Sequence, residues 1–336
     1  MKYDILIFVQ AAADLRYALD IIHKNRNKKI QLYVIHVKAI YDFVSSLNLE
    51  NIQIHFQDYF GLKIKDIRTY LKVKKQLSFF WKKEFSRNNY DAVYFFSRFY
   101  DFHTASIIVK LGNKNVIYYD HYDTVSIIND QKVDKFSLLF FKNKYIALVV
   151  SLISGADFIS VHRKRYLEFN YKKYGIERRL ITKLVKVNTE FKYSTTRSKQ
   201  SNSVVFLLSP DELDMITKDA LLKLKEIIFF LKNQGYKLYI KGHPRLGTAE
   251  LYLDFFHEEI PNFVPAEFLS YKEFSFTIGV ISSSLVYPSL LNEHKVYSLV
   301  NLLEFKINKD KHFFSFFLKE HSKNNIIFVK KLSDLV

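Results

Sequence analysis

Two short segments in the second half of the chain carry side chains suited to binding a phosphate. The first, Lys241-Gly242-His243-Pro244-Arg245, follows the apolar alternating run Tyr236–Ile240; the second, Ser282-Ser283-Ser284, follows the run 274–280. Such runs predict strands, and a helix is predicted from 285 to 291. An imidazole, an ammonium group and hydroxyls at a helix start, where the helix dipole is positive, are suitable ligands of a phosphate. The two segments therefore predict an anion site.

Each segment also has an ordinary structural explanation. Proline after a strand is common in turns, and serines before a helix commonly act as its cap. Their combination favours a shared site, because both follow predicted strands and ligands of open α/β sheets bind at the carboxyl ends of strands.

The elements that would position these motifs alternate along the whole chain. In the first half we predict strands at 5–9, 30–37, 52–55, 92–96, 116–119 and 157–161, and helices at 12–25, 39–47, 62–85, 102–111 and 136–154. In the second half we predict strands at 204–208, 236–240, 274–280 and 296–300, helices at 211–233 and 285–291, and a partly helical tail at 318–336. This alternation predicts an α/β protein with parallel sheets covered on both faces.

Bulk composition limits the class of protein. The 336 residues allow two domains, and 49% hydrophobic with 25% charged residues is a globular composition. The absence of cysteine excludes disulfides, cysteine-ligated zinc and a thiol nucleophile, and agrees with a cytoplasmic protein. The first residues, Met1-Lys-Tyr-Asp4, lead straight into an apolar run and predict no secretion signal.

The formal net charge of +17 suggests an anionic partner. No signature of an RNA-recognition motif, zinc finger or helix-turn-helix is present, so we expect no nucleic-acid partner. The apolar stretch 145–154 is too short to span a bilayer. It is either a buried helix or a membrane-surface helix with basic flanks, which would place the protein peripherally on the inner membrane.

Three segments together resemble a known group of enzymes. Lys241-Gly-His-Pro-Arg245, Ile260-Pro-Asn-Phe-Val-Pro-Ala-Glu267 and Gly279-Val-Ile-Ser-Ser-Ser-Leu285 are similar to the carboxyl half of bacterial sialyltransferases, the group of lipooligosaccharide sialyltransferases and capsule polysialyltransferases. The resemblance implies a GT-B fold of two Rossmann-like domains facing a central cleft. It also implies inverting transfer of sialic acid from its CMP-activated form to a glycan acceptor in surface polysaccharide or lipooligosaccharide synthesis.

The resemblance also assigns the domains. Residues 1–190 would form the acceptor-side domain with the general base, 191–203 a polar linker, and 204–336 the CMP-sugar-binding domain, with its tail packing back on the first domain. No cofactor is implied, because the CMP-sugar is a substrate. The sequence lacks Asp-x-Asp, a common metal site for sugar diphosphates, so we expect no metal.

The resemblance implies a role for each motif residue. His243 would stabilise the leaving phosphate, Glu267 would hold the ribose hydroxyls, and Ser209 would line the cytosine pocket. Hydroxyls of the serine run would donate to the phosphate, and Lys241 would add positive charge. The donor-binding set is then Ser209, Lys241, Gly242, Pro244, Glu267, Ser282, Ser283 and Ser284.

The first domain departs from the group's pattern. The enzymes carry two acidic residues followed by glycine after a strand, whereas this chain has Asp120-His121-Tyr122-Asp123 there. Asp120, His121 and Asp123 are therefore alternative general bases, and histidine would act near neutral pH without any shift. The departure also leaves the sugar open, since another nonulosonic acid or Kdo would fit.

Two other functions stay open from the sequence. A CMP-glycerol or CMP-ribitol phosphotransferase of the teichoic-acid type also combines a GT-B fold, a His-Pro motif and a serine run. A non-catalytic basic module that binds membranes or nucleic acid would not need the His243 and Ser284 motifs at one site.

Overall fold

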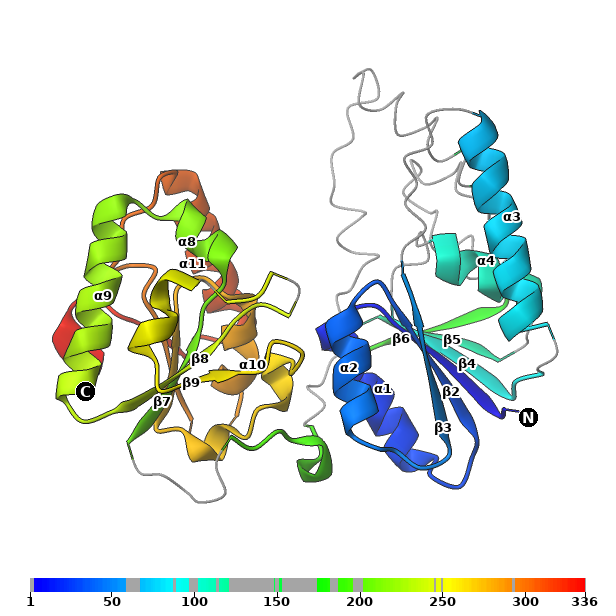
Figure 1. Ribbon diagram of the computed structural model, residues 1–336, viewed down its shortest axis with the longest axis horizontal. Coiled ribbons are helices and arrows are strands. Elements are labelled where there is room, and N and C mark those ends of the chain that lie inside the picture. Colours follow the sequence, from blue (N-terminus) through cyan, green and yellow to red (C-terminus); the bar gives the residue numbers. More distant parts are fainter. Residues whose placement is uncertain are drawn as a thin grey trace. The chain divides into compact units, whose positions relative to one another are not determined.

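The computed structural model describes residues 3–58, 67–86, 89–96, 102–112, 115–120, 148, 151–152, 174–181, 187–195, 202–244, 246–248, 250–291 and 294–335. The chain divides into two compact units, Met1–Lys186 and Val187–Val336. Each unit contains one six-stranded sheet with helices packed on it (Figure 1). The two-sheet, two-domain organisation predicted from the alternating pattern is confirmed.

The first domain has the strand order of a Rossmann domain. Its sheet runs β3-β2-β1-β4-β5-β6, and all described pairs are parallel. The strands are β1 (Ile5–Val9), β2 (Ile30–Ile35), β3 (Ile52–Gln57), β4 (Ala92–Phe95), β5 (Val116–Asp120) and β6 (Ile176–Leu180). The helices are α1 (Ala12–Lys24), α2 (Lys38–Ser46), α3 (Ile67–Glu84) and α4 (Phe102–Leu111). Figure 1 shows α1 and α2 on one side of the sheet and α3 and α4 on the other, as right-handed crossovers require.

The second domain repeats this order. Its sheet runs β12-β11-β10-β7-β8-β9, again with parallel pairs. The strands are β7 (Ser203–Leu207), β8 (Lys237–Lys241), β9 (Glu258–Ile260), β10 (Phe276–Gly279), β11 (Lys295–Ser298) and β12 (Ile326–Phe328). The helices are α8 (Pro210–Met215), α9 (Lys218–Asn233), α10 (Val286–Ser289) and α11 (Asn308–His321).

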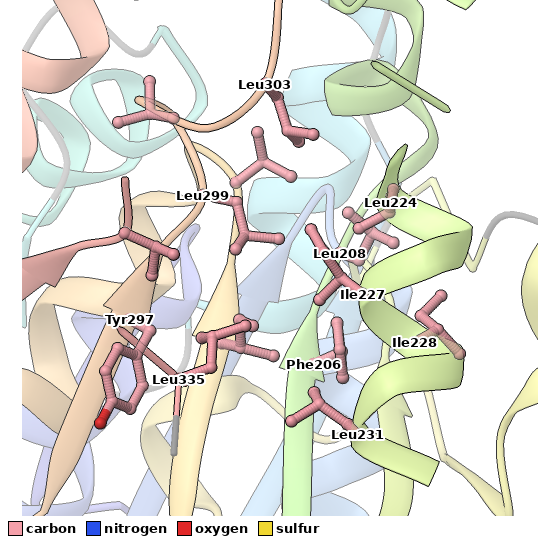
Figure 2. Packing of buried hydrophobic residues seen from close by; sticks show 14 of the residues in the cluster. Phe206, Leu208, Leu224, Ile227, Ile228, Leu231, Tyr297, Leu299, Leu303 and Leu335 are labelled. Atoms are coloured by element: carbon pink, nitrogen blue, oxygen red, sulfur yellow. The ribbon is translucent and has the colours of Figure 1, made fainter. Parts of the chain in front are cut away.

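The core of the second domain lies between α9 and the sheet. Figure 2 shows Leu224, Ile227 and Leu231 of α9 on the side of the helix toward Phe206 and Leu208, and Ile228 belongs to the same buried cluster. These four positions follow the three-and-four spacing of an amphipathic helix, and each is fully buried. All five residues of β7 are buried, which is typical of a central strand in a parallel sheet covered on both faces. This packing holds in place the strands whose carboxyl ends lead into the motifs.

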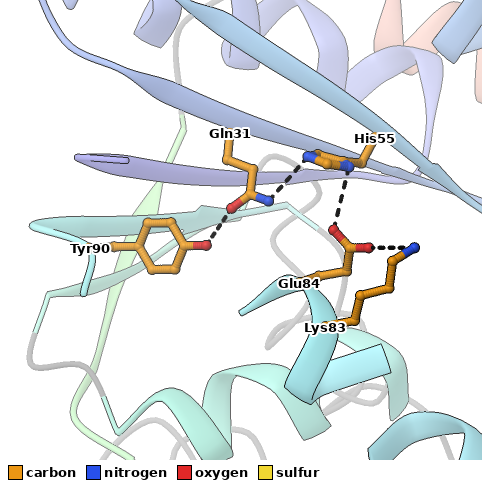
Figure 3. Close-up of polar contacts among 5 residues, drawn as sticks. All are labelled: Gln31, His55, Lys83, Glu84 and Tyr90. Atoms are coloured by element: carbon orange, nitrogen blue, oxygen red, sulfur yellow. Dashed lines mark hydrogen bonds and ion pairs between the residues drawn. The ribbon is translucent and has the colours of Figure 1, made fainter. Parts of the chain in front are cut away.

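A chain of polar side chains joins α3 to the sheet of the first domain (Figure 3). The Tyr90 hydroxyl donates to the Gln31 amide oxygen, and the Gln31 amide nitrogen lies 3.2 Å from His55 Nε2. His55 Nδ1 lies 3.6 Å from the Glu84 carboxylate, which also pairs with Lys83 at 3.3 Å. Burial lowers the pKa of His55, so the ring is neutral and its Nδ1 proton faces Glu84. These polar contacts anchor the end of α3 to the sheet, and nothing in the sequence pattern indicated them.

Three strands were not predicted: β6, β9 and β12. β6 carries Glu177, Arg178 and Arg179 in its five residues, and β9 begins with Glu258 and Glu259. β12 has three residues and lies in the tail that was predicted to be partly helical. Each lies at the edge of its sheet, where a strand forms by pairing with one neighbour and needs no alternating apolar pattern.

The predicted helix 211–233 is two helices. Ile216 is extended, fully buried and bridged to Phe305, and the Thr217 side chain accepts a hydrogen bond from Ala220 N at 3.2 Å. Thr217 therefore caps a new helix, α9. The predicted helix after the serine run is also shorter, since a 3₁₀ turn over Ser283–Leu285 leads into the four residues of α10. A single turn adds little of the dipole that the sequence suggested.

The second compact unit begins at Val187, shortly before the predicted linker 191–203. Part of the predicted linker 191–203 packs on the second domain, because Tyr193 N donates to Phe268 O at 2.7 Å and Ser270 N donates to Tyr193 O at 2.9 Å. The end of the tail belongs to the same domain, since β12 pairs with β11 and Leu335 is in its core. The predicted packing of the tail on the first domain stays a prediction.

Among the described residues, no helix has the length and hydropathy needed to cross a bilayer. The stretch 145–154, for which a buried or a membrane-surface helix was proposed, lies almost wholly outside the described residues, as does the predicted strand 157–161.

Candidate functional site

The motif residues of the second domain lie at one edge of its sheet. A single rung of paired residues, Gly279–Leu207–Lys241–Ile260, crosses the ends of β10, β7, β8 and β9. Because the strands are parallel, the chain leaves all of them on the same side. Neighbouring strands lie about 4.8 Å apart, so the loops after β8 and β10 start roughly 10 Å from each other. The fold thus brings together the motifs that are separated in sequence.

This edge contains the position where the strand order reverses. β7 is the first strand of its domain and β10 the fourth, and their neighbours continue in opposite directions. Ligands of doubly wound sheets bind in the crevice at such a point. Ser209 follows β7 and Ser282 follows β10, so the residues predicted to bind the donor flank this crevice.

The loop after β8 holds His243 through its backbone and its ring. His243 and Gly247 exchange two backbone hydrogen bonds of 2.9 Å, and Leu246 N donates to His243 Nδ1 at 3.2 Å. Because Nδ1 accepts a hydrogen bond from Leu246 N, the neutral ring must carry its own proton on Nε2. In this geometry His243 is an Nε2–H donor, whereas a doubly protonated ring would lose the hydrogen bond from Leu246 N.

Gly242 has no room for a side chain. A Cβ there would lie 2.2 Å from Thr248 Oγ1 and 2.4 Å from Gly247 O. We expect Gly242→Ala to displace the segment that pairs with His243, lowering the free energy of unfolding by about 1–3 kcal/mol and weakening nucleotide binding. Urea unfolding and titration with CMP measure both effects.

Gly235→Ala is the matched control, because Gly235 has a positive φ of +81° but open space around it. It should lose stability through backbone strain and keep its nucleotide affinity. Equal nucleotide affinity in the Gly242 and Gly235 variants would contradict the role given to the Gly242 loop.

Lys241 supports the loops around the site. Its side chain is buried, and its ammonium group donates to Gly242 O and, at 3.4 Å, to Asn262 O. Burial lowers the pKa of Lys241 to about 8, while the charges of Glu267 and Glu259 act in the opposite direction. The ammonium group is thus engaged with carbonyls of two loops, which gives Lys241 a positioning role. The positive charge that it was predicted to add at the donor site stays a prediction.

Glu267 lies beside this lysine. It is part of the 3₁₀ turn Ala266–Phe268 that follows β9, and it is partly exposed. Its charge acts on both Lys241 and the buried Tyr271, whose hydroxyl donates to Ala266 O at 2.8 Å. A partly exposed carboxylate at this edge is chemically able to accept two ribose hydroxyls.

The three serines after β10 have different surroundings. The Ser282 hydroxyl accepts from Ser284 N at 3.3 Å and so acts as a cap of the 3₁₀ turn. Ser283 is exposed and Ser284 is partly exposed, and no hydrogen bond of either hydroxyl is described. Ser283 and Ser284 therefore remain able to donate to a ligand, whereas Ser282 has a structural role.

Sequence reasoning missed Glu212 at this edge. Glu212 is the third residue of α8, whose N-cap is Ser209, and its side chain is buried. The Ser209 backbone and the Ser282 hydroxyl both lie close enough to its carboxyl to favour the charged form. The only available signal was the spacing of a capping box, Ser209-Pro-Asp-Glu212.

In the first domain, the structure describes one of the three candidate bases. Asp120 ends β5, its side chain is fully buried, and Arg178 of β6 binds its Oδ2 through Nε at 2.9 Å and through a terminal nitrogen at 2.8 Å. A carboxylate held by a guanidinium is a weak base. His121 and Asp123 lie outside the described residues.

A polar contact joins the loops at the corresponding edge of the first domain. Asp14 accepts from Gln10 N at 3.0 Å and Ala11 N at 2.8 Å, and the Gln10 amide donates to Thr104 at 3.1 Å. Burial raises the pKa of Asp14 to about 6. The loop after β1 is thus fixed to α4. Nowhere in the described part of the chain do three or more histidine or acidic side chains gather as metal ligands.

Solved structures with similar folds were found for the whole chain. UGT89C1 from Arabidopsis thaliana is 10% identical, with a TM-score of 0.50, over 98% of this chain and 85% of that one. The UDP-GlcNAc 2-epimerase of Methanocaldococcus jannaschii is 13% identical, with a TM-score of 0.50, over 100% and 90%. The GT-B domain of a sialyltransferase from Photobacterium damselae is 13% identical over 98% and 100%, but its TM-score of 0.43 carries no inference.

No family model and no curated protein matches the sequence. At these identities the structural likeness establishes the fold alone. The two Rossmann-like sheets and the similar structures identify a GT-B fold, as predicted. The central cleft between the domains stays a prediction.

Proposed function

We propose that the protein is an inverting glycosyltransferase that moves sialic acid, or a related nonulosonic acid, from its CMP-activated form to a glycan acceptor. The observation that carries this proposal is the rung at the ends of β10, β7, β8 and β9. It supports a single donor site made from the His243 loop, the serine loop and Glu267. A GT-B fold is compatible with this activity, and the sequence motifs favour this donor.

The proposed reaction is one displacement at the anomeric carbon. The acceptor oxygen forms a bond to that carbon, the bond from the carbon to the phosphate oxygen breaks, and CMP leaves. His243 Nε2–H and the hydroxyls of Ser283 and Ser284 donate to the phosphate oxygens, which gain charge as that bond breaks. The geometry of His243 favours a neutral hydrogen-bond donor, so the leaving group departs as an anion held by several donors.

The acceptor proton goes to a base in the first domain. The ion pair with Arg178 argues against Asp120, so we propose His121 or Asp123 for this role. Acceptor, linkage and peripheral association with the inner membrane remain predictions from the sequence.

A donor panel tests the proposed function. The protein is incubated with CMP-sialic acid, CMP-Kdo, CMP-glycerol and UDP-GlcNAc, and nucleotide release is followed with and without a glycan acceptor. We expect CMP release from a CMP-nonulosonic acid, unchanged by EDTA, because His243 and the serines supply the phosphate contacts without a metal.

The other outcomes identify the competing functions. Transfer of glycerol phosphate would establish the phosphotransferase function. Release of UDP would show that the protein uses a UDP-sugar, the class of compound that appears in the name of the Methanocaldococcus jannaschii epimerase. Activity that EDTA abolishes and magnesium restores would reject the metal-independent mechanism. If no donor is used or bound, the non-catalytic alternative is favoured.

A further inference from the structure

Glu212 lies at the point where the strand order of the second domain reverses. It belongs to the first turn of α8, directly after β7, and contacts the Ser282 hydroxyl in the loop after β10. Its carboxyl therefore joins the two loops that flank the crevice. Asp211 and Asp214 on the same helix are exposed, but Glu212 points inward.

One oxygen of this carboxyl is buried without a hydrogen-bond partner. The Glu212 side chain is 5% exposed, and its Oε2 forms no hydrogen bond. A buried carboxylate with an unpaired oxygen is strongly disfavoured, whereas a protonated carboxyl is tolerated. Burial raises the pKa of Glu212 to about 8, with a further increase from the charge of Asp211.

We propose that Glu212 is a positioning residue of the donor-phosphate site: its protonated carboxyl holds the loops after β7 and β10 together, and its ionisation weakens phosphate binding to the serine loop. This deepens the proposed function and rests on its assignment of the phosphate to Ser283 and Ser284. A neutral carboxyl orients the Ser282 hydroxyl without repelling the ligand. An ionised one would place a negative charge beside the phosphate and weaken its binding roughly tenfold or more.

The charged groups around Glu212 define the expected pH dependence. Asp211 acts on it directly, Lys306 binds the Asp214 carbonyl at the other end of α8, and Lys241 lies at the end of β8. Lys241 also loses its proton near pH 8, and this loss weakens anion binding in every variant that keeps the lysine. The effect of Glu212 is therefore the difference between wild type and Glu212→Gln.

Sulfate and CMP are the two probes of this site. Sulfate is a tetrahedral dianion that does not titrate near neutral pH, and its affinity is measured by calorimetry from pH 6.5 to 9.5. We expect Glu212→Gln to match wild type at pH 6.5, because an amide accepts the same two hydrogen bonds. At pH 9.5 it should bind sulfate roughly tenfold more tightly than wild type. Glu226→Gln, on the exposed side of α9, is the control and should follow wild type.

Asp211→Asn is a second variant for which the direction of the change in the pH profile can be predicted. Removing the Asp211 charge lowers the pKa of Glu212, so the alkaline loss of sulfate affinity should begin at a lower pH than in wild type. Glu212→Ala leaves Ser282 without its acceptor and should bind sulfate more weakly at every pH. Thermal unfolding at pH 6.5 establishes that each variant is folded.

The outcomes separate this inference from the proposed function. Identical pH profiles for wild type and Glu212→Gln, or no sulfate binding by wild type, would overturn the role of Glu212. If the profiles differ as expected but CMP binds no more tightly than sulfate, the anion site stands and the CMP donor is wrong. If CMP also binds tightly and follows the same pH difference, both are supported.

Discussion

Replacing His243 with alanine is expected to lower kcat by about 100-fold or more while changing CMP affinity only a few-fold. The charge on the leaving phosphate is larger in the transition state than in the bound donor, so a hydrogen bond to it matters most there. Steady-state kinetics with the active donor and calorimetry with CMP separate the two quantities.

Two further variants separate the two ring nitrogens of His243. Asparagine retains an acceptor near the position of Nδ1, where Leu246 N donates, but has no group at Nε2. Glutamine places an N–H donor near the position of Nε2. We expect His243→Asn to be stable and as slow as the alanine variant, and His243→Gln to recover part of kcat. Recovery in the asparagine variant, or an alanine variant within a few-fold of wild type, would show that His243 is only a turn residue.

Replacing Asp120 with alanine is expected to lower the free energy of unfolding by about 3 kcal/mol or more. The carboxylate is fully buried, and its loss removes the ion pair with the Arg178 guanidinium, which is 27% exposed. Denaturant unfolding of Asp120→Ala, Arg178→Met and the double variant measures the pair. The double variant should lose less than the sum of the two single variants, because each single variant already removes the interaction between the two side chains.

The same position tests the assignment of the general base. Asp120→Asn preserves the shape of the side chain, so the transfer rate of its folded fraction should stay within a few-fold of wild type. His121→Ala and Asp123→Ala are compared with it. The true base is the one whose loss keeps CMP affinity, slows transfer and removes the acidic limb of the pH–rate profile. If that variant is Asp120→Asn, the ion pair is part of the catalytic site, and the base assignment returns to Asp120.

The sequence by itself determined the fold class and the location of the candidate site. β1 and α4 have the bounds that the apolar pattern predicted. In a buried strand or helix, the local pattern of apolar residues marks where the element begins and ends. The His243 and serine motifs could be placed at strand ends for the same reason. The carboxyl ends of parallel strands lie at one edge of their sheet. The two motifs were therefore expected to lie near each other once both preceding strands had been assigned to the same sheet.

Only the tertiary structure decided what these side chains contact. Lys241 and Asp120 look like site charges in the sequence, yet one binds loop carbonyls and the other is paired with Arg178. Arg178 lies in a charged edge strand that no local pattern predicts. The unpaired oxygen of Glu212 is buried where the loops after two neighbouring strands, distant in sequence, come together. Burial and pairing of charged groups are set by neighbours from other elements, and local sequence therefore does not contain them.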